Sequence, residues 1–142
     1  YDKSNSALQS EGWITADGAL APEHDAAHKH WGGDWRMPTK QEFDDLNSKC
    51  DWIWTTINGI NGYIVCGRGD YASSKIFLPA AGSADDFSLN DAVTGYYRSS
   101  VPRLEYDYIA WGLYFGLDFH YTDWGFWHAY GQSIRPVQSY SK

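Results

Sequence analysis

The spacing of apolar residues changes character once along the chain, near residue 50. Before that point apolar positions follow helical spacing, as Phe43 and Leu46 do at i and i+3. After it, short runs rich in aromatic and β-branched residues alternate with clusters of turn residues, which is the pattern of β-strands. Helices that precede a set of short antiparallel strands predict an α+β domain.

Two helices are expected in the first part of the chain. Pro22 suits a first helical position, and residues 23–30 continue as a short helix with an acidic first turn. The second helix begins at a capping box, in which the Thr39 hydroxyl accepts from the amide of Glu42 and the Glu42 carboxylate reaches back. This helix should run to about Cys50, with Phe43 on its core-facing side.

The rest of the chain is expected to form strands joined by turns and one long loop. Residues 58–62, Asn-Gly-Ile-Asn-Gly, tolerate the positive φ angles of a hairpin turn. Residues 80–95 are small and polar, and a loop of this length is usually functional or mobile. The strand candidates are residues 13–15, 52–57, 63–65, 76–79, 96–100, 108–115, 124–127 and 133–137.

A length of 142 residues fits one domain. Residues 1–11 are polar and without pattern, so we interpret them as a linker or tail and assign residues 12–142 to a single domain. The aromatic share is 18%, with eight Trp and eleven Tyr. This is more flat side chain than a core of this size needs, and Tyr and Trp dominate binding surfaces.

The net charge of −7 argues against a nucleic-acid partner, because affinity for a phosphate backbone depends on clustered Lys and Arg. After residue 75 the only Lys or Arg residues before the last position are Arg98, Arg103 and Arg135. No apolar run reaches the roughly 18–20 residues of a membrane span, so we expect no membrane insertion. The chain begins at Tyr1 rather than Met, and we expect any targeting segment to lie outside it.

Seven motifs follow one another in fixed order between residues 25 and 137. They are Asp25-Ala26-Ala27-His28, Trp31-Gly32-Gly33-Asp34-Trp35-Arg36-Met37-Pro38-Thr39, Cys50-x-Trp52-x-Trp54-Thr55, Asn58-Gly59-Ile60-Asn61-Gly62-Tyr63, Ile76-Phe77-Leu78-Pro79-Ala80-Ala81-Gly82, Tyr97-x-Ser99-Ser100 and Gly131-Gln132-Ser133-Ile134-Arg135-Pro136-Val137. Together they resemble the Fibrobacter-type major paralogous domain, a family common in surface and secreted proteins of gut Bacteroidetes and their phages.

The resemblance implies a C-type-lectin-like fold, shared with the formylglycine-generating enzymes and with variable proteins of diversity-generating retroelements. In such a fold the segment 35–39 joins the two helices, and the strand at 134–137 closes the domain against its N-terminal strand. The resemblance also implies a place outside the cell, on a bacterial surface protein, a pilus-like adhesin or a phage tail. Function has to be argued from the site, because one fold hosts many functions.

The segment from residue 104 to 130 departs most from the family pattern. Eleven of the 25 aromatic residues lie between Tyr106 and Tyr130, interleaved with Gly, Asp, His and Thr. Rigid rings beside adaptable polar residues are typical of antibody-type binding surfaces. Trp111, Leu113 and Phe115 alternate like core residues. The predicted ligand-binding residues are Arg98, Tyr106, Tyr108, Gly112, Tyr114, Gly116, Phe119, Tyr121, Asp123, Trp124, Phe126 and Trp127.

In retroelement-diversified members of this fold, adenine mutagenesis rewrites codons in that same segment. Asn codons then become codons for Tyr, Asp, Gly, Phe, His, Ser, Leu or Arg. Most of the predicted ligand-binding positions carry such residues, which fits diversification. Trp124 and Trp127 do not follow from Asn codons, so the sequence leaves diversification open.

Metal sites are not expected. The calcium-binding tripeptides of C-type lectins are absent, and we interpret Asp85-Asp86 and Asn90-Asp91 as solvated loop residues. His24 and His28 lie at i and i+4, but no carboxylate or thiol is placed to complete a transition-metal site.

Enzymatic activity is not expected either. Formylglycine-generating relatives use a cysteine pair late in the chain, which Cys50 and Cys66 do not match, and no motif of nucleophilic catalysis is present. The two cysteines flank a predicted hairpin and could pair, although we favour free thiols. No cofactor is implied.

The sequence therefore predicts a ligand-binding or display module, such as an adhesin or receptor-binding domain. It would present a variable aromatic surface to an extracellular protein or glycan. Two alternatives stay open: a structural domain of a surface lipoprotein that packs against a neighbouring domain, and a lectin that binds glycans without calcium.

Overall fold

The computed structural model describes residues 3–84, 89–90 and 93–139, and the calcium candidates Asp85, Asp86 and Asp91 lie outside these ranges. The helices are α1 (Asn5–Ser10), α2 (Ala26–Trp31) and α3 (Lys40–Lys49), with 3-10 turns η1 (Pro22–His24) and η2 (Gly69–Tyr71). The strands are β1 (Trp35–Arg36), β2 (Asp51–Ile57), β3 (Ile60–Cys66), β4 (Lys75–Pro79), β5 (Ser83–Ala84), β6 (Leu89–Asn90), β7 (Gly95–Pro102), β8 (Ile109–Gly116), β9 (Phe119–Trp127) and β10 (Val137–Gln138). Helices with antiparallel sheets confirm the α+β class.

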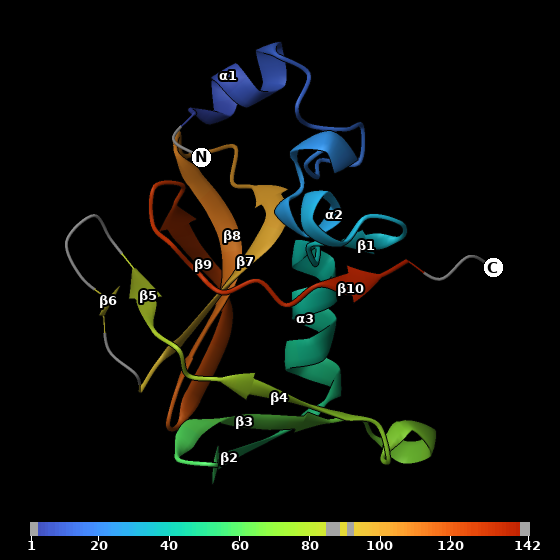
Figure 1. Ribbon diagram of the computed structural model, residues 1–142, viewed down its shortest axis with the longest axis vertical. Coiled ribbons are helices and arrows are strands. Elements are labelled where there is room, and N and C mark those ends of the chain that lie inside the picture. Colours follow the sequence, from blue (N-terminus) through green and yellow to red (C-terminus); the bar gives the residue numbers. More distant parts are fainter. Residues whose placement is uncertain (1–2, 85–88, 91–92, 140–142) are drawn as a thin grey trace.

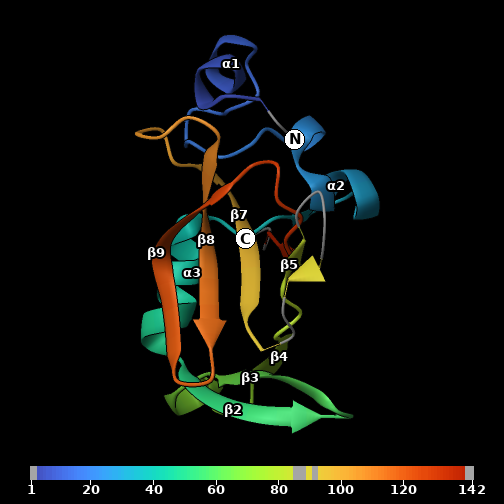
Figure 2. The same cartoon turned by 90° about the vertical axis from the view of Figure 1, so that its left-hand side faces the viewer.

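Two three-stranded sheets and α3 form the body of the domain. The β7-β8-β9 sheet turns one face toward α3, and the β2-β3-β4 sheet lies across one end of it (Figures 1 and 2). The remaining strands form two short pairs, β1 with β10 and β5 with β6. The face of β7-β8-β9 that α3 does not cover is turned toward the viewer in Figure 2.

Helix α3 begins at the capping box that the sequence predicts. The Glu42 amide donates to Thr39 Oγ1 at 3.2 Å, and the Thr39 amide donates to Glu42 Oε2 at 2.8 Å. Arg36 donates to both Glu42 carboxylate oxygens, at 2.6 and 2.7 Å. This bidentate bond holds the pKa of Glu42 below its ordinary value, and it ties β1 to the start of α3.

The helix expected over residues 23–30 is divided at Asp25. Pro22 starts a 3-10 turn, and Asp25 is extended and caps α2 by accepting from the amides of Ala27 and His28. Its other oxygen accepts from the amide of Met37 at 2.8 Å. One buried carboxylate thus satisfies three amides, and the helix starts later than expected because Asp25 is its N-cap.

The hairpin of β2 and β3 has a shorter turn than the expected five residues. Only Asn58 and Gly59 turn the chain, with φ of 51° and 78°, and Ile57 already pairs with Ile60. Two positive φ angles match the right-handed twist of the flanking strands. The expected strands at 52–57 and 63–65 therefore extend to the turn.

The first and last strands pair, as the resemblance implies, but with a different first strand. Trp35 pairs with Gln138 and Arg36 with Val137. Residues 13–15, the expected N-terminal strand, form only an isolated bridge between Ile14 and Leu20. β10 pairs with residues 35–36 instead of with this segment.

Residues 1–11 differ from the linker or tail that the sequence predicts. Residues 5–10 form α1, capped by the Ser4 hydroxyl, which accepts from the amide of Ala7. Leu8 is fully buried and Asn5 is 1% exposed. The helix belongs to the domain because its buried side chains anchor it, although its sequence shows no clear amphipathic pattern.

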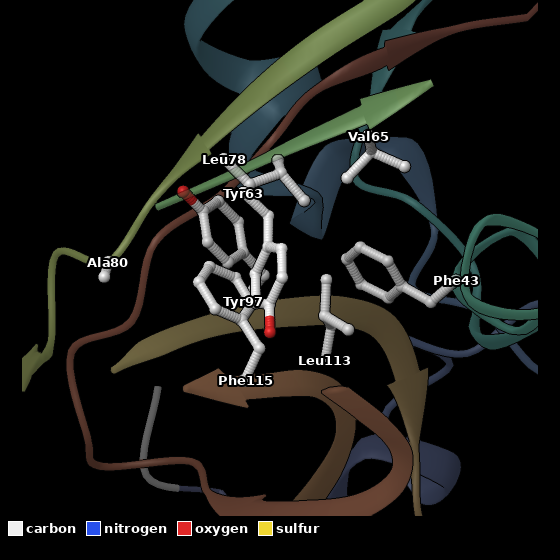
Figure 3. Close-up of a cluster of buried hydrophobic side chains, with 8 residues drawn as sticks. All are labelled: Phe43, Tyr63, Val65, Leu78, Ala80, Tyr97, Leu113 and Phe115. Atoms are coloured by element: carbon white, nitrogen blue, oxygen red, sulfur yellow. The ribbon is translucent and has the colours of Figure 1, made fainter. Parts of the chain in front are cut away.

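The hydrophobic core lies between α3 and the two larger sheets. Its buried side chains, drawn in Figure 3, are Phe43, Tyr63, Val65, Leu78, Ala80, Tyr97, Leu113 and Phe115. Two hydroxyls in it reach main-chain carbonyls: Tyr63 Oη donates to Leu117 and Tyr97 Oη to Pro79, both at 3.0 Å. Burial raises the pKa of Tyr97 to about 12. Leu113, Phe115 and Phe43 confirm predicted core positions. Trp111, predicted with them, is only partly buried, and Lys40 and Arg103 lie over its ring.

Replacing the buried Asp25 tests the junction between α2 and β1. Asp25→Ala leaves three amides without an acceptor, so we expect the free energy of unfolding to fall by about 3 kcal/mol. Urea unfolding measures this loss. The control Glu23→Ala, at an exposed position of η1, should change stability by less than about 0.5 kcal/mol. Equal effects of the two changes would contradict this role of Asp25.

Candidate functional site

Alternation along β8 assigns its side chains to two faces of the sheet. Leu113 and Phe115 are fully buried in the core on the α3 side. Gly112 and Tyr114 therefore point to the opposite face, because successive side chains of a strand point to opposite sides. This opposite face, seen in Figure 2, carries the candidate site.

Six aromatic side chains form a connected layer on this face, which we call the aromatic face. Tyr114 is at its centre, with ring centroids 4.8 Å from Tyr96, 4.9 Å from Phe119 and 5.9 Å from Trp124. The members are Tyr96, Tyr114, Phe119, Tyr121, Trp124 and Phe126. Five of them were predicted from the sequence as ligand-binding residues, and Tyr96 was missed.

Two glycines support the rings instead of facing a ligand. Gly112 is buried, and a methyl group there would lie 2.7 Å from the ring of Phe126. Gly116 is also buried, and a methyl group there would lie 2.6 Å from the ring of Phe119. Both positions were predicted as ligand-binding. In the structure, aromatic side chains of β9 pack directly against these two glycines. One of these side chains, Phe126, is only 6% exposed.

A bulge in β9 tilts part of the aromatic face outward. Gly112 pairs with Trp124 and Tyr114 with Tyr121, so two residues of β9 stand opposite Leu113 alone. An extra residue of this kind bends the strand and increases its twist. Tyr121 and Trp124, on either side of the bulge, are 52% and 53% exposed, and Asp123 within it is exposed as well.

Arg98 is buried, and its side chain lies on the same side of the sheet as those of Tyr96 and Tyr114. Its Nη2 donates to the carbonyls of Trp127 at 2.8 Å and Tyr130 at 3.0 Å. The guanidinium therefore holds the turn after β9 against β7. Arg98, which the sequence predicts as a binding residue, is only 7% exposed, and its guanidinium binds main-chain carbonyls.

Tyr106, Tyr108 and Trp127 are exposed but are not members of the aromatic face, although Trp127 also lines a pocket beside it. Tyr106 and Tyr108 belong to the loop between β7 and β8, where the guanidinium carbon of Arg103 lies 4.8 Å from the Tyr106 ring centroid. Trp127 follows Phe126 in β9, so its side chain points to the other side of the strand. The predicted residues thus divide into the aromatic face, this neighbouring exposed group and the buried supports.

The loop between β7 and β8 is held by α1. Asn5 Nδ2 donates to the carbonyls of Arg103, Tyr106 and Ile109, at 2.8, 2.8 and 3.1 Å. Tyr108 has a φ of 67°, a conformation uncommon for a bulky residue, and its carbonyl accepts from the His128 amide. No local pattern in the sequence indicates this role for Asn5, because the residue precedes all the recognisable motifs.

A pocket of about 450 Å³ opens on the aromatic face. It is lined by Ser83, Tyr96, Trp124, Gly125, Phe126, Trp127, Tyr130 and Gln132. Its volume is within the range of small-molecule sites, which is roughly 300–1,000 Å³. Rings from β7 and β9 therefore meet the segment after β9 around a hollow that a ligand group can enter.

A second cavity of about 460 Å³ lies near β1, lined in part by Asp25, His28 and Arg36. These three side chains already have partners in the fold. Arg36 binds Glu42, Asp25 caps α2, and His28 Nδ1 lies 3.3 Å from the carbonyl of Trp35. These bonds explain the motif residues structurally, so we place the functional site on the aromatic face.

The histidines and cysteines also have structural surroundings. His24 stacks on Trp13 with ring centroids 3.8 Å apart, and no group of three or more potential metal ligands occurs among the described residues. Cys50 and Cys66 are free thiols, and burial raises the pKa of Cys50. No helix in the described ranges is long and apolar enough to cross a bilayer.

No family model, curated protein or solved structure matches this chain.

Asn5→Asp tests whether α1 holds the loop beneath Tyr106 and Tyr108. A carboxylate would face three carbonyl oxygens without a proton to donate, so we expect the free energy of unfolding to fall by about 3 kcal/mol or more. Urea unfolding, with hydrogen exchange of the loop amides, measures the effect. Gln9→Glu makes the same chemical change at an exposed position of α1 and should be near neutral. Similar stability of both variants would show that Asn5 does not hold the loop.

The buried His128 predicts a loss of stability in acid. Burial lowers the pKa of His128 below its ordinary value of 6.5, and its Nδ1 lies 2.8 Å from the carbonyl of Lys3. The unfolded chain then binds the proton more readily than the folded one. The neutral, buried His128 side chain therefore makes its full contribution to stability above about pH 6.5. This contribution declines as the pH falls from 6.5 through the lowered pKa of His128 in the folded state.

Urea midpoints between about pH 7.5 and pH 5 measure this dependence. His128→Gln should flatten the profile, and His30→Gln, at an exposed position of α2, serves as the control. Burial also lowers the pKa of His120, so part of the slope should remain in His128→Gln. An unchanged slope in that variant would contradict the prediction.

Proposed function

We propose that this chain is a non-enzymatic ligand-binding module whose aromatic face meets the ligand. The observation that carries the proposal is a connected layer of six rings on the sheet face opposite the core, with Tyr121 and Trp124 about half exposed. Core packing does not require these rings, since Leu113, Phe115 and Tyr97 fill the other face.

The aromatic face has the properties of a preorganised binding surface. Tyr114 contacts four neighbouring rings, and Gly112 and Gly116 seat Phe126 and Phe119. Rings that are fixed before binding lose little conformational entropy when a ligand arrives. Large aromatic side chains are also the commonest energetic anchors of protein interfaces.

The proposed setting is the one implied by the sequence resemblance. The chain would be a domain of the Fibrobacter-type major paralogous family with a C-type-lectin-like fold, displayed outside the cell on a surface protein, an adhesin or a phage tail. The pairing of the first strand, β1, with the last strand, β10, is compatible with that fold. The ligand would be an extracellular protein or glycan, and neither a metal nor a cofactor is needed.

Retroelement diversification is part of the same proposal at selected positions. Tyr114, Phe119, Tyr121 and Asp123 carry residues that Asn codons can yield, and they lie outside the core cluster. Gly112 supports Phe126 and tolerates no larger side chain without rearrangement. A near-copy of the coding region for residues 98–130 beside a reverse transcriptase gene would support diversification.

A structural role is the second candidate, and one observation favours it. Ile53, Ile57 and Ile60 are exposed on the β2-β3 hairpin, with exposed fractions of 54%, 39% and 51%. An apolar patch of this kind suits packing against a neighbouring domain. Size-exclusion chromatography of the isolated domain distinguishes the two roles, because an uncovered interdomain surface promotes self-association.

Removing the two half-exposed rings beside the bulge tests the proposed function. We expect Tyr121→Ala with Trp124→Ala to weaken binding to glycan arrays or host cells at least about a hundredfold, as the loss of two anchors implies. The melting temperature should fall by only a few degrees, because both side chains lie outside the core.

The matched control is Trp31→Ala with Ile53→Ala, two residues of similar exposure away from the aromatic face. This variant should bind like the parent protein. A large loss of stability in the Tyr121/Trp124 variant would mean that these rings serve the fold. Loss of binding in the control variant would move the site elsewhere. Trp127→Ala, measured separately, shows whether the ligand also reaches the other side of β9.

A further inference from the structure

The pocket on the aromatic face has one polar side chain that the fold leaves unsatisfied. Both amide atoms of Gln132, Nε2 and Oε1, are buried and have no hydrogen-bond partner within the part of the chain that the structure describes. Gln132 lines the pocket together with Phe126 and Trp124. Buried polar groups in proteins are nearly always paired, so a donor and acceptor left together need an explanation.

The chemistry of the lining restricts what the pocket accepts. Among the residues that the structure describes, none of the eight that line the pocket is charged, which favours a neutral ligand group. The polar groups are the hydroxyls of Ser83, Tyr96 and Tyr130 and the amide of Gln132. The other side chains are aromatic rings, which suit a methyl group or the C–H face of a sugar ring. The pocket is therefore built for a small neutral group that combines an apolar part with hydrogen-bonding atoms.

An unpaired side-chain amide offers a donor and an acceptor side by side. The complementary partner is another amide, which accepts from Nε2 through its carbonyl and donates to Oε1 through its N–H. An acetamido group provides both atoms and adds a methyl group that fits against the ring of Phe126. A single sugar hydroxyl pairs with either the donor Nε2 or the acceptor Oε1 of Gln132, but not with both atoms at the same time.

We propose that this pocket binds the acetamido group of an N-acetylhexosamine on a glycan, with Gln132 as the specificity-determining residue. The proposal depends on the aromatic face being the ligand surface, and it names the ligand class. Trp124 and Tyr96 would flank the sugar, and the hydroxyls of Ser83 and Tyr130 would meet those of the sugar ring.

A glycan fits this pocket better than a peptide amide does. An acetamido group is terminal and enters a pocket end-on, whereas a main-chain amide carries backbone on both sides. Three hydroxyl groups in the lining also match a ligand rich in hydroxyls. The peptide alternative is included as an outcome of the test.

The first measurement compares stability and binding in Gln132→Met, which keeps the side-chain length and removes both polar atoms. Replacing an unsatisfied buried amide by an apolar group should leave the melting temperature unchanged or raise it. Binding of the acetylated sugar should weaken at least about tenfold, the effect of losing a buried hydrogen-bond pair. Gln9→Met, at an exposed position of α1, is the control and should change neither. A clear loss of stability in Gln132→Met would show that the amide has a structural partner and would overturn the proposal.

The second measurement is saturation-transfer NMR and titration of the whole chain with three probes. These are the β1,4-linked dimer of N-acetylglucosamine, cellobiose, which lacks only the acetamido groups, and N-acetylalanine amide. We expect the acetylated dimer to bind with a Kd of order 1 mM, ordinary for a ligand of this size, and to show its strongest saturation at the acetyl methyl. Cellobiose and the peptide amide should bind at least about tenfold more weakly.

Each other outcome contradicts the proposal in a distinct way. Equal binding of cellobiose would mean that the rings bind sugars without reading the acetamido group. Stronger binding of N-acetylalanine amide would assign the pocket to peptides. Failure of all three probes would remove the N-acetylhexosamine assignment. In these cases the wider ligand-binding function is still decided by the Tyr121/Trp124 variant on arrays and cells.

Discussion

The two-residue period of β8 is the constraint on which the rest of the structure depends. One set of its side chains, Leu113 and Phe115, fills the space beneath α3, and the residues between them face the other way. Because β8 is the central strand of its sheet, the side chains of β7 and β9 are divided between the same two faces. The core and the aromatic face are therefore built from adjacent positions of one strand, and neither can shift register without disrupting the other.

The buried polar groups hold the irregular segments that border the aromatic face. Arg98 binds two carbonyls of the turn after β9, Asn5 binds three carbonyls of the loop before β8, and Asp25 joins α2 to β1. Such segments lack the regular bonds of helices and sheets, so side chains have to satisfy their main-chain groups. Rigidity at the surface thus comes from polar residues in the interior.

Much of the fold could be predicted because its signals are local. The capping box of Thr39 and Glu42, the Asn58-Gly59 turn and the alternation around Leu113 are each contained in a few neighbouring residues. The site was predictable only in outline. Burial of Arg98 and the contacts of Asn5 arise between residues about 30 and 100 positions apart, and local patterns do not report them. Gln132 lies inside a motif that resembles scaffold, so nothing in its surroundings marked it as unpaired.

Gly112 and Gly116 limit how the aromatic face can change during evolution. Because a larger side chain at Gly112 or Gly116 would collide with Phe126 or Phe119, these two positions of β8 determine how the rings pack. The chemistry of the face is set by the rings of all three strands. Substitutions at Tyr121 or Trp124 alter what the surface offers without altering the volume of the core. Exposed positions of β9 can therefore change while the two glycines of β8 keep the packing of the neighbouring rings.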